Sequence, residues 1–158
     1  MISNGKELFT LLDNLLKPHG FIRKKDTWYL HTPECICFFS IGKSQFGGHY
    51  DHVMGCFLKE IHDDLEEYPK YYKNDLKYGL DDLADKQTVK EVLDFQNSKF
   101  VQNQREIILK DLIENHAVPF LKDISSKEGI KDSIKKYKGL FNRTKGRLIE
   151  NLGISLQK

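Results

Sequence analysis

The spacing of apolar residues predicts a helix at the start of the chain. Asn4 and Glu7 have the spacing of an N-terminal capping box. Leucines then recur at intervals of three and four residues, which places them on one side of a helix; they are Leu8, Leu11, Leu12, Leu15 and Leu16. Pro18 cannot continue a helix and Gly20 accepts a left-handed backbone, so we expect the helix to end near Lys17 and the chain to turn sharply.

From residue 21 to residue 61 the period becomes two, as in β-strands. The segment "TWYLH" (27–31) is rich in residues that favour strands and follows a predicted turn at Lys25-Asp26. "CICFFSI" (35–41) is apolar on both sides, which is typical of a central strand covered on each face. "YDHVMGCFLKEI" (50–61) follows a turn at Gly47-Gly48. We expect three or four antiparallel strands joined as a meander.

Beyond Asp63 the spacing is helical. We expect either short helices or a helix followed by a loop up to about residue 86, with Pro69 and Gly79 as interruptions. The apolar positions with helical spacing in this part are Tyr72, Leu76, Leu80 and Leu83. A second capping box, Thr88 with Glu91, predicts the start of a longer helix that breaks near Asn97.

Three further signals predict helices in the last third of the chain. Pro119 starts or kinks a short segment, and Ser125 with Glu128 forms a third capping box. The helix that follows this box ends at Gly139. The segment "RLIENLGISL" (147–156) supplies a last apolar stripe. The order of these elements predicts one α+β domain over residues 1–158, with an N-terminal helix (1–18), an antiparallel meander sheet (21–61) and a helical part (63–158) that covers the sheet.

Several short motifs, taken in order, resemble one bacterial protein family. They are the leucine run 12–16, "HGF" (19–21), the cations 23–25, "TWY" (27–29), "KSQFG" (43–47), "YDHVMGCFLKEI" (50–61) and "PFL" (119–121). In this order they are similar to the family called domain of unknown function 4304, over nearly the whole chain. The resemblance implies a small bacterial α+β protein. It transfers no catalytic residue.

Composition narrows the picture to a soluble globular protein. Of the 158 residues, 39% are hydrophobic and 30% charged, with a formal net charge of +2, so no strong overall field requires a nucleic acid or an anionic membrane. No secretory signal and no apolar run of membrane-spanning length is present, and we expect a cytoplasmic protein. Acidic residues predominate from Glu60 to Asp94 and basic residues from Lys127 to Arg147. These two regions either attract each other within the fold or serve different partners.

The reactive residue types do not form a recognised catalytic or metal-binding motif. Cys35 and Cys37 share a strand face, and the strand register decides whether Cys56 joins them; we expect reduced thiols in the core. His49 and His52 are three residues apart, so they point to opposite faces of a strand. We therefore predict no catalytic residue, no metal site and no cofactor, and keep a metal-dependent hydrolase as an alternative because carboxylates are plentiful.

The stretch "LKPHGFIRKKDTWYLH" (16–31) could form a nucleic-acid-binding site, in which the aromatic rings stack on bases and the cations contact phosphates. If Phe21 and Trp28 lie on the core face, we expect Arg23, Lys25 and Tyr29 on the other face, where they are exposed unless a helix covers it. Because tryptophan and phenylalanine usually supply core, a bend between helix and sheet is the preferred interpretation.

We expect a non-enzymatic binding protein, of the immunity type that neutralises a protein partner through complementary charge. The acidic stretch would suit a basic toxin. A weak nucleic-acid-binding domain that uses residues 23–25 and the basic C-terminal third is the alternative. The candidate binding residues lie on one sheet face and in the loops around "KSQFGGHY"; they are Arg23, Lys25, Tyr29, Lys43, Gln45, His49 and Tyr50.

Overall fold

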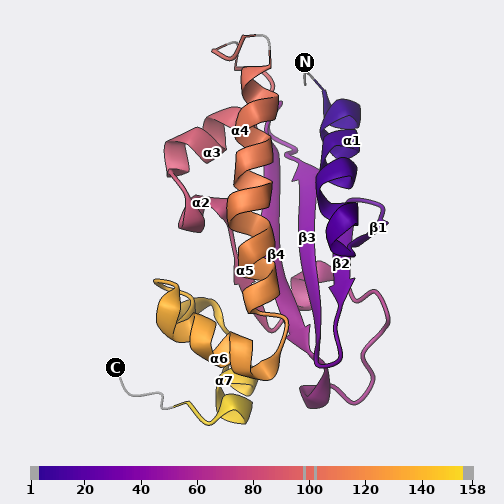
Figure 1. The fold of residues 1–158 in the computed structure, drawn as a ribbon, viewed down its shortest axis with the longest axis vertical. Helices are drawn as coiled ribbons and strands as arrows, with labels where there is room; N and C mark the ends of the chain where they lie inside the picture. Colours follow the sequence, from indigo (N-terminus) through magenta and orange to yellow (C-terminus); the bar gives the residue numbers. More distant parts are fainter. Residues whose placement is uncertain (1–3, 98, 102, 155–158) are drawn as a thin grey trace.

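A computed structural model describes residues 4–97, 99–101 and 103–154 and has an α+β architecture (Figure 1). Its strands form an antiparallel sheet in which neighbours in sequence are neighbours in space. The strands are β1 (Ile22–Lys24), β2 (Thr27–His31), β3 (Cys35–Lys43), β4 (Tyr50–Leu58) and β5 (Leu76–Tyr78). The predicted meander is confirmed, with five strands in place of three or four.

Helices cover one face of this sheet. They are α1 (Gly5–Leu16), α2 (Leu80–Leu83), α3 (Lys86–Val92), α4 (Gln104–Leu112), α5 (Val118–Asp123), α6 (Lys127–Lys136) and α7 (Gly146–Leu152). The strand register places Trp28, Phe39 and Met54 side by side on the covered face. They belong to one apolar core with residues from α1, α3 to α7 and β5. Figure 1 shows α1 and the α4–α5 rod lying along the sheet.

The α4–α5 rod passes through Pro119 without breaking. A π-helical turn, Ile113–Ala117, separates α4 from α5. Pro119 has no N–H to donate to a carbonyl one turn earlier, and the wider turn before it lets the rod continue. The segment that was predicted to start or kink at Pro119 is therefore the end of a longer rod.

The opposite face of the sheet is covered by a loop. Phe38 and Phe57 point to this face and are buried below segment 65–71, which contributes Leu65 and Tyr68 to a second apolar cluster. The Tyr71 ring lies 6.4 Å from the Phe38 ring. Both faces of "CICFFSI" are thus covered, as its apolar pattern predicts.

The prediction of helical structure between Asp63 and Gly79 is wrong. This segment is a loop with one short 3-10 turn (Tyr71–Lys73), followed by β5. Leu76 and Tyr78 do point the same way, but as alternate residues of a strand that pairs with β4. Gly55 allows this pairing, because a Cβ on Gly55 would lie 1.9 Å from the carbonyl oxygen of Leu76.

Two predicted helix starts are displaced by a few residues. Asp85, three residues before Thr88, caps α3 by accepting from the Thr88 N–H. Ser126, one residue after the predicted Ser125, caps α6 by accepting from the Gly129 N–H. Asn4 caps α1 as predicted. In each case a competing polar side chain nearby satisfies the free N–H groups of the first turn.

Candidate functional site

The β3–β4 hairpin carries four of the predicted binding residues. Lys43 ends β3, Gln45 lies in the connection, His49 precedes β4 and Tyr50 begins it. The connection is held in place: the Ser44 N–H donates to the His49 carbonyl (2.9 Å), and the Phe95 N–H donates to the Gly48 carbonyl (3.2 Å). The tip is therefore an ordered projection supported by the chain that follows α3.

Phe46, at the tip of this hairpin, is 85% exposed. Its N–H donates to Oγ of Ser44 (3.1 Å), which fixes the backbone while the ring faces solvent. Sequence reasoning included the segment that contains Phe46 but not the residue itself. The sequence would have allowed the exposure of Phe46 to be predicted, because an aromatic residue between Gln45 and Gly47 has no apolar neighbour in the turn to pack against.

A hollow of about 590 Å³ lies at the base of the hairpin. It brings together three of the predicted residues, Arg23, Lys43 and Tyr50, with Lys6 and Phe9 of α1. The other lining residues are Gly5, Thr10, Asp26, Ile41 and Gly42. Three cations and one carboxylate around apolar walls favour an anionic or mixed anionic and apolar ligand group.

Arg23 occupies this hollow because it lies on the helix-covered face, opposite to the prediction. The β1–β2 register pairs Arg23 with Trp28. Its guanidinium donates to Asp13 of α1 (3.0 Å) and lies 4.8 Å from the centre of the Phe9 ring. The long side chain at a sheet edge reaches the helix and stays partly in water, which a pattern of alternation does not reveal.

Lys25 and Tyr29 do not join this hollow. Lys25 is exposed at the β1–β2 turn with a φ of 58°. Tyr29 is on the opposite face, as predicted, but only 5% of it is exposed. Its hydroxyl donates to the Pro69 carbonyl (2.8 Å) and its ring contacts Tyr68. Burial also raises the pKa of this hydroxyl. The loop over this face explains why Tyr29 is not a surface residue.

A second site lies at the other end of the sheet, where β4 ends and α7 begins. Asp75 is fully buried there and holds three groups. It accepts from the Leu58 N–H (2.9 Å) and from Nε of Arg147 (2.7 Å), and it lies 2.7 Å from Nε2 of His62. A buried carboxylate with these partners fixes the position of Arg147.

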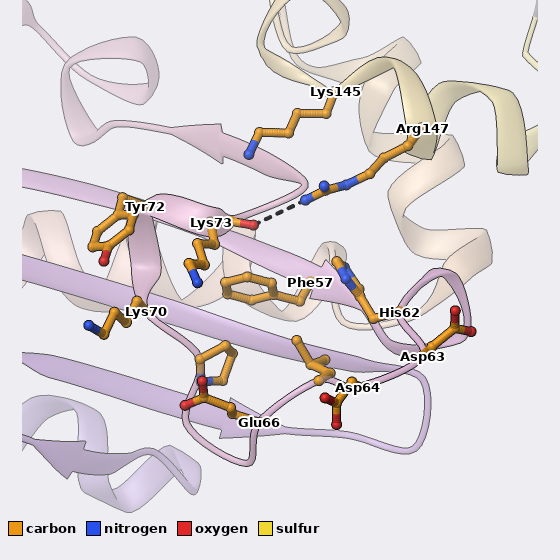
Figure 2. A pocket seen from close by; sticks show the side chains of 12 residues that line it. Phe57, His62, Asp63, Asp64, Glu66, Lys70, Tyr72, Lys73, Lys145 and Arg147 are labelled. Carbon is orange, nitrogen blue, oxygen red and sulfur yellow. Dashed lines mark hydrogen bonds between the residues drawn. The ribbon is translucent and has the colours of Figure 1, made fainter.

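Arg147 borders a hollow of about 370 Å³ (Figure 2). One side of the opening carries Arg147, Lys145 and Lys73, and the guanidinium also donates to the Lys73 carbonyl (3.1 Å). The other side is the loop with Asp63, Asp64 and Glu66. The remaining lining residues are Phe57, His62, Leu65, Pro69, Lys70 and Tyr72. The hollow thus has a cationic wall and an acidic wall.

Lys145 is partly buried beside two other cations, Arg147 and Lys77. Its pKa is lowered by partial burial and by Arg147, an effect that Asp75 opposes and Lys77 reinforces. Within the described ranges, Lys145 forms no ion pair. Sequence reasoning placed this lysine only in a generally basic region, since its neighbours Lys73 and Lys77 are some seventy residues away in the chain.

The acidic and basic regions of the chain attract each other within the fold. Three ion pairs join them: Glu60 with Lys127 (3.1 Å), Asp75 with Arg147 (2.7 Å) and Asp82 with Arg143. Of the two alternatives that the sequence left open, internal attraction accounts for these pairs. The acidic stretch is therefore partly neutralised by the protein itself.

The cysteines lie in the core as free thiols. The register pairs Cys37 with Cys56, so all three sulfur atoms lie on the helix-covered face. Burial raises the pKa of Cys35 to about 12 and raises those of the other two thiols well above their usual value. The thiols are protonated at neutral pH, which makes them poor nucleophiles.

His52 of β4 and His49, which precedes this strand, both line a hollow of about 330 Å³ beside α3, but they have different partners. Nε2 of His49 lies 3.7 Å from Asp51. Nε2 of His52 accepts from the Leu80 N–H (2.7 Å). In the described part of the chain, no three histidine, cysteine or carboxylate side chains come together in a way that would hold a metal ion. No helix among the described residues has the length and apolar character that crossing a membrane requires.

Comparison with known proteins places this architecture in a family. Neither the curated proteins nor the solved structures contained a match to this chain. The family model described as "Domain of unknown function (DUF4304)" matches residues 12–123. This range includes the sheet, the hairpin, Asp75 and the α4–α5 rod, and it leaves α6 and α7 outside. The chain therefore belongs to the DUF4304 family.

Proposed function

We propose that this protein is a non-enzymatic binding protein that docks a protein partner on its hairpin end, in the manner of immunity-type proteins that neutralise a partner by occupying it. The hairpin end consists of Phe46, the β3–β4 connection and the hollow lined by Arg23, Lys43 and Tyr50. The observation that carries the proposal is the exposure of Phe46 on an ordered turn.

An exposed aromatic ring on a fixed backbone suits a binding interface. Placing Phe46 in water costs free energy that burial against a partner recovers, about 2 kcal/mol for one phenylalanine side chain. Aromatic anchors of this kind dominate many protein interfaces. Because the turn is already held by hydrogen bonds from Ser44 and Phe95, little conformational entropy is lost when the ring is covered.

The charges of the hollow indicate the chemistry of the partner. Lys6 and Lys43 form no ion pair within the described ranges, whereas Arg23 is already engaged by Asp13. An acidic side chain beside an apolar one would contact these lysines and the walls made by Phe9 and Tyr50. We therefore propose an acidic segment as the partner of this end, in place of the basic toxin that the acidic stretch suggested.

A quantitative pull-down from the native host tests this proposal. The substitution Phe46→Asp removes the anchor and should abolish enrichment of the partner, and Lys43→Glu should weaken it at least tenfold. Ile107→Asp is the matched control, because Ile107 is 65% exposed on α4 and does not line the hollow of the hairpin end, so this variant should retain the partner. A partner that binds the Phe46→Asp protein as well as the unmodified protein would contradict the proposal.

A further inference from the structure

The Arg147 hollow continues into a second hollow of about 220 Å³. Tyr72 and Lys145 line both, and the second also contains Lys77 and Arg143. Its other lining residues are Asn74, Asn142 and Thr144. Six cations line the adjoining hollows. Lys70 lies on the loop that carries Glu66, and the other five form the cationic strip, which consists of Lys73, Lys77, Arg143, Lys145 and Arg147.

The fold brings these cations together from two distant segments. Lys73 and Lys77 flank the start of β5, while Arg143, Lys145 and Arg147 come from the chain before α7 and its first turn. Backbone pairing fixes this approach: the Lys145 N–H donates to the Asp75 carbonyl (2.8 Å), and Thr144 bridges to Leu76. Arg143 and Arg147 are paired with Asp82 and Asp75, whereas Lys73, Lys77 and Lys145 form no ion pair within the described ranges. An anion between these lysines would remove their mutual repulsion.

The strip contains an exposed aromatic ring at its middle. Tyr72 is 58% exposed and contacts Tyr71 edge to face. A cationic groove with an exposed ring is the arrangement that binds single-stranded nucleic acid, because the cations contact phosphates and the ring stacks on a base. An acidic peptide would use the cations and leave the ring without a role.

We propose that the cationic strip binds single-stranded nucleic acid, with the backbone phosphates along Lys73, Lys145 and Lys77 and one base on Tyr72. The strand runs from the Arg147 hollow toward Lys77 and Arg143. The carboxylates of Asp63, Asp64 and Glu66 border only the first hollow, on the side opposite the lysines, and repel a strand from that direction. The strip shares no residue with the hollow at the base of the hairpin, so the two surfaces can be varied separately.

Binding of a fluorescently labelled oligo(dT) by the full chain, followed by fluorescence anisotropy at several salt concentrations, tests the proposal. We expect binding at low salt that weakens as salt rises, with a logarithmic slope near 0.7 for each phosphate contacted. The double variant Lys77→Gln/Lys145→Gln should bind more weakly and have a slope smaller by about 1.4, because two phosphate contacts are lost. Lys135→Gln, an exposed lysine of α6 outside the strip, is the control and should bind like the unmodified protein.

Tyr72 distinguishes a strand from any other polyanion. Tyr72→Ala should weaken binding about tenfold, whereas Tyr72→Phe keeps the stacking ring and should bind normally. Binding is also measured with inorganic phosphate and with a mononucleotide, and poly-glutamate is added as a competitor of the labelled strand. Lack of binding at low salt would overturn the proposal. So would equal competition by poly-glutamate with no effect of Tyr72→Ala, or saturation by a mononucleotide as tight as that by the strand.

Discussion

His52 illustrates how a single residue acquires its environment from the fold. Its ring stacks on Phe39 at 6.1 Å and its Nε2 accepts from the Leu80 N–H at the start of α2. Burial lowers its pKa, and this effect outweighs the opposing influence of Asp81, Asp51 and Asp82. The neutral imidazole is therefore the form that the folded protein needs, because a protonated ring has no free lone pair for the Leu80 N–H.

The residue-scale prediction concerns pH. Since the pKa of His52 is lower in the folded than in the unfolded chain, the unfolded chain binds more protons below about pH 6.5. This contribution to the free energy of unfolding is complete above pH 6.5 and is lost as the pH falls from there through the folded pKa. Urea unfolding between pH 7.5 and 5.5 measures it, and His52→Gln should flatten this part of the profile because glutamine accepts without titrating. A His52→Gln protein whose profile is as steep as that of the unmodified chain would contradict the prediction.

At the scale of elements, strand β5 depends on the absence of a side chain at Gly55. The two strands approach so closely that a methyl group at Gly55 meets the Leu76 carbonyl and the Cα of Lys77. Alternation of apolar residues is too short in Leu76–Tyr78 to indicate a strand, and the same residues fit a helical stripe. The glycine in the partner strand was the more informative signal.

The element-scale prediction is that Gly55→Ala destabilises the protein by about 1–3 kcal/mol, because β5 must move away from β4 to admit the methyl group. The midpoint of urea unfolding reports this loss. Gly146→Ala at the start of α7 is the control, since nothing lies within 4 Å of a Cβ there and no change or a slight gain is expected. Equal midpoints for the two variants would show that the β4–β5 contact is less restrictive than described.

At the scale of the whole molecule, Asp75 connects the sheet with the C-terminal helices. Its carboxylate contacts the end of β4, His62 and Arg147, and its backbone pairs with Cys56 and Lys145. The core also extends through Leu148 and Leu152 of α7, although the family match ends at residue 123. The C-terminal helices are therefore part of the packed structure.

We expect Asp75→Asn to lower the free energy of unfolding by about 2–3 kcal/mol, because His62 and Arg147 lose the charge that holds them. This loss of stability is smaller than for a fully buried ion pair, because the Arg147 side chain is half exposed and remains hydrated. Urea denaturation provides the measurement. Asp63→Asn, an exposed carboxylate in the adjacent loop, should change stability by less than about 0.5 kcal/mol. A similar small effect at Asp75 would show that the carboxylate does not couple the two parts.

Local patterns in the sequence were sufficient for the features that depend on near neighbours. The α1 helix with its Asn4 cap, the turn at Gly20 and strands β2 to β4 follow from spacing and turn residues alone. The position of Lys43, Gln45, His49 and Tyr50 at one hairpin could be predicted because the turn glycines mark its tip. Amphipathic spacing and capping act over three or four residues, so a single sequence contains them in full.

Contacts between distant segments required the tertiary structure. The side of the sheet on which Arg23 lies, the strand β5 and the loop that buries Tyr29 all depend on which segments pack together. The Asp75 cluster and the cationic strip unite residues some seventy positions apart, and no local pattern encodes that distance. The sequence by itself determined the type of fold and the hairpin, whereas the packing of the mid-chain loop and C-terminal helices on the sheet decided which charges remain free, because ion pairs form according to proximity in space.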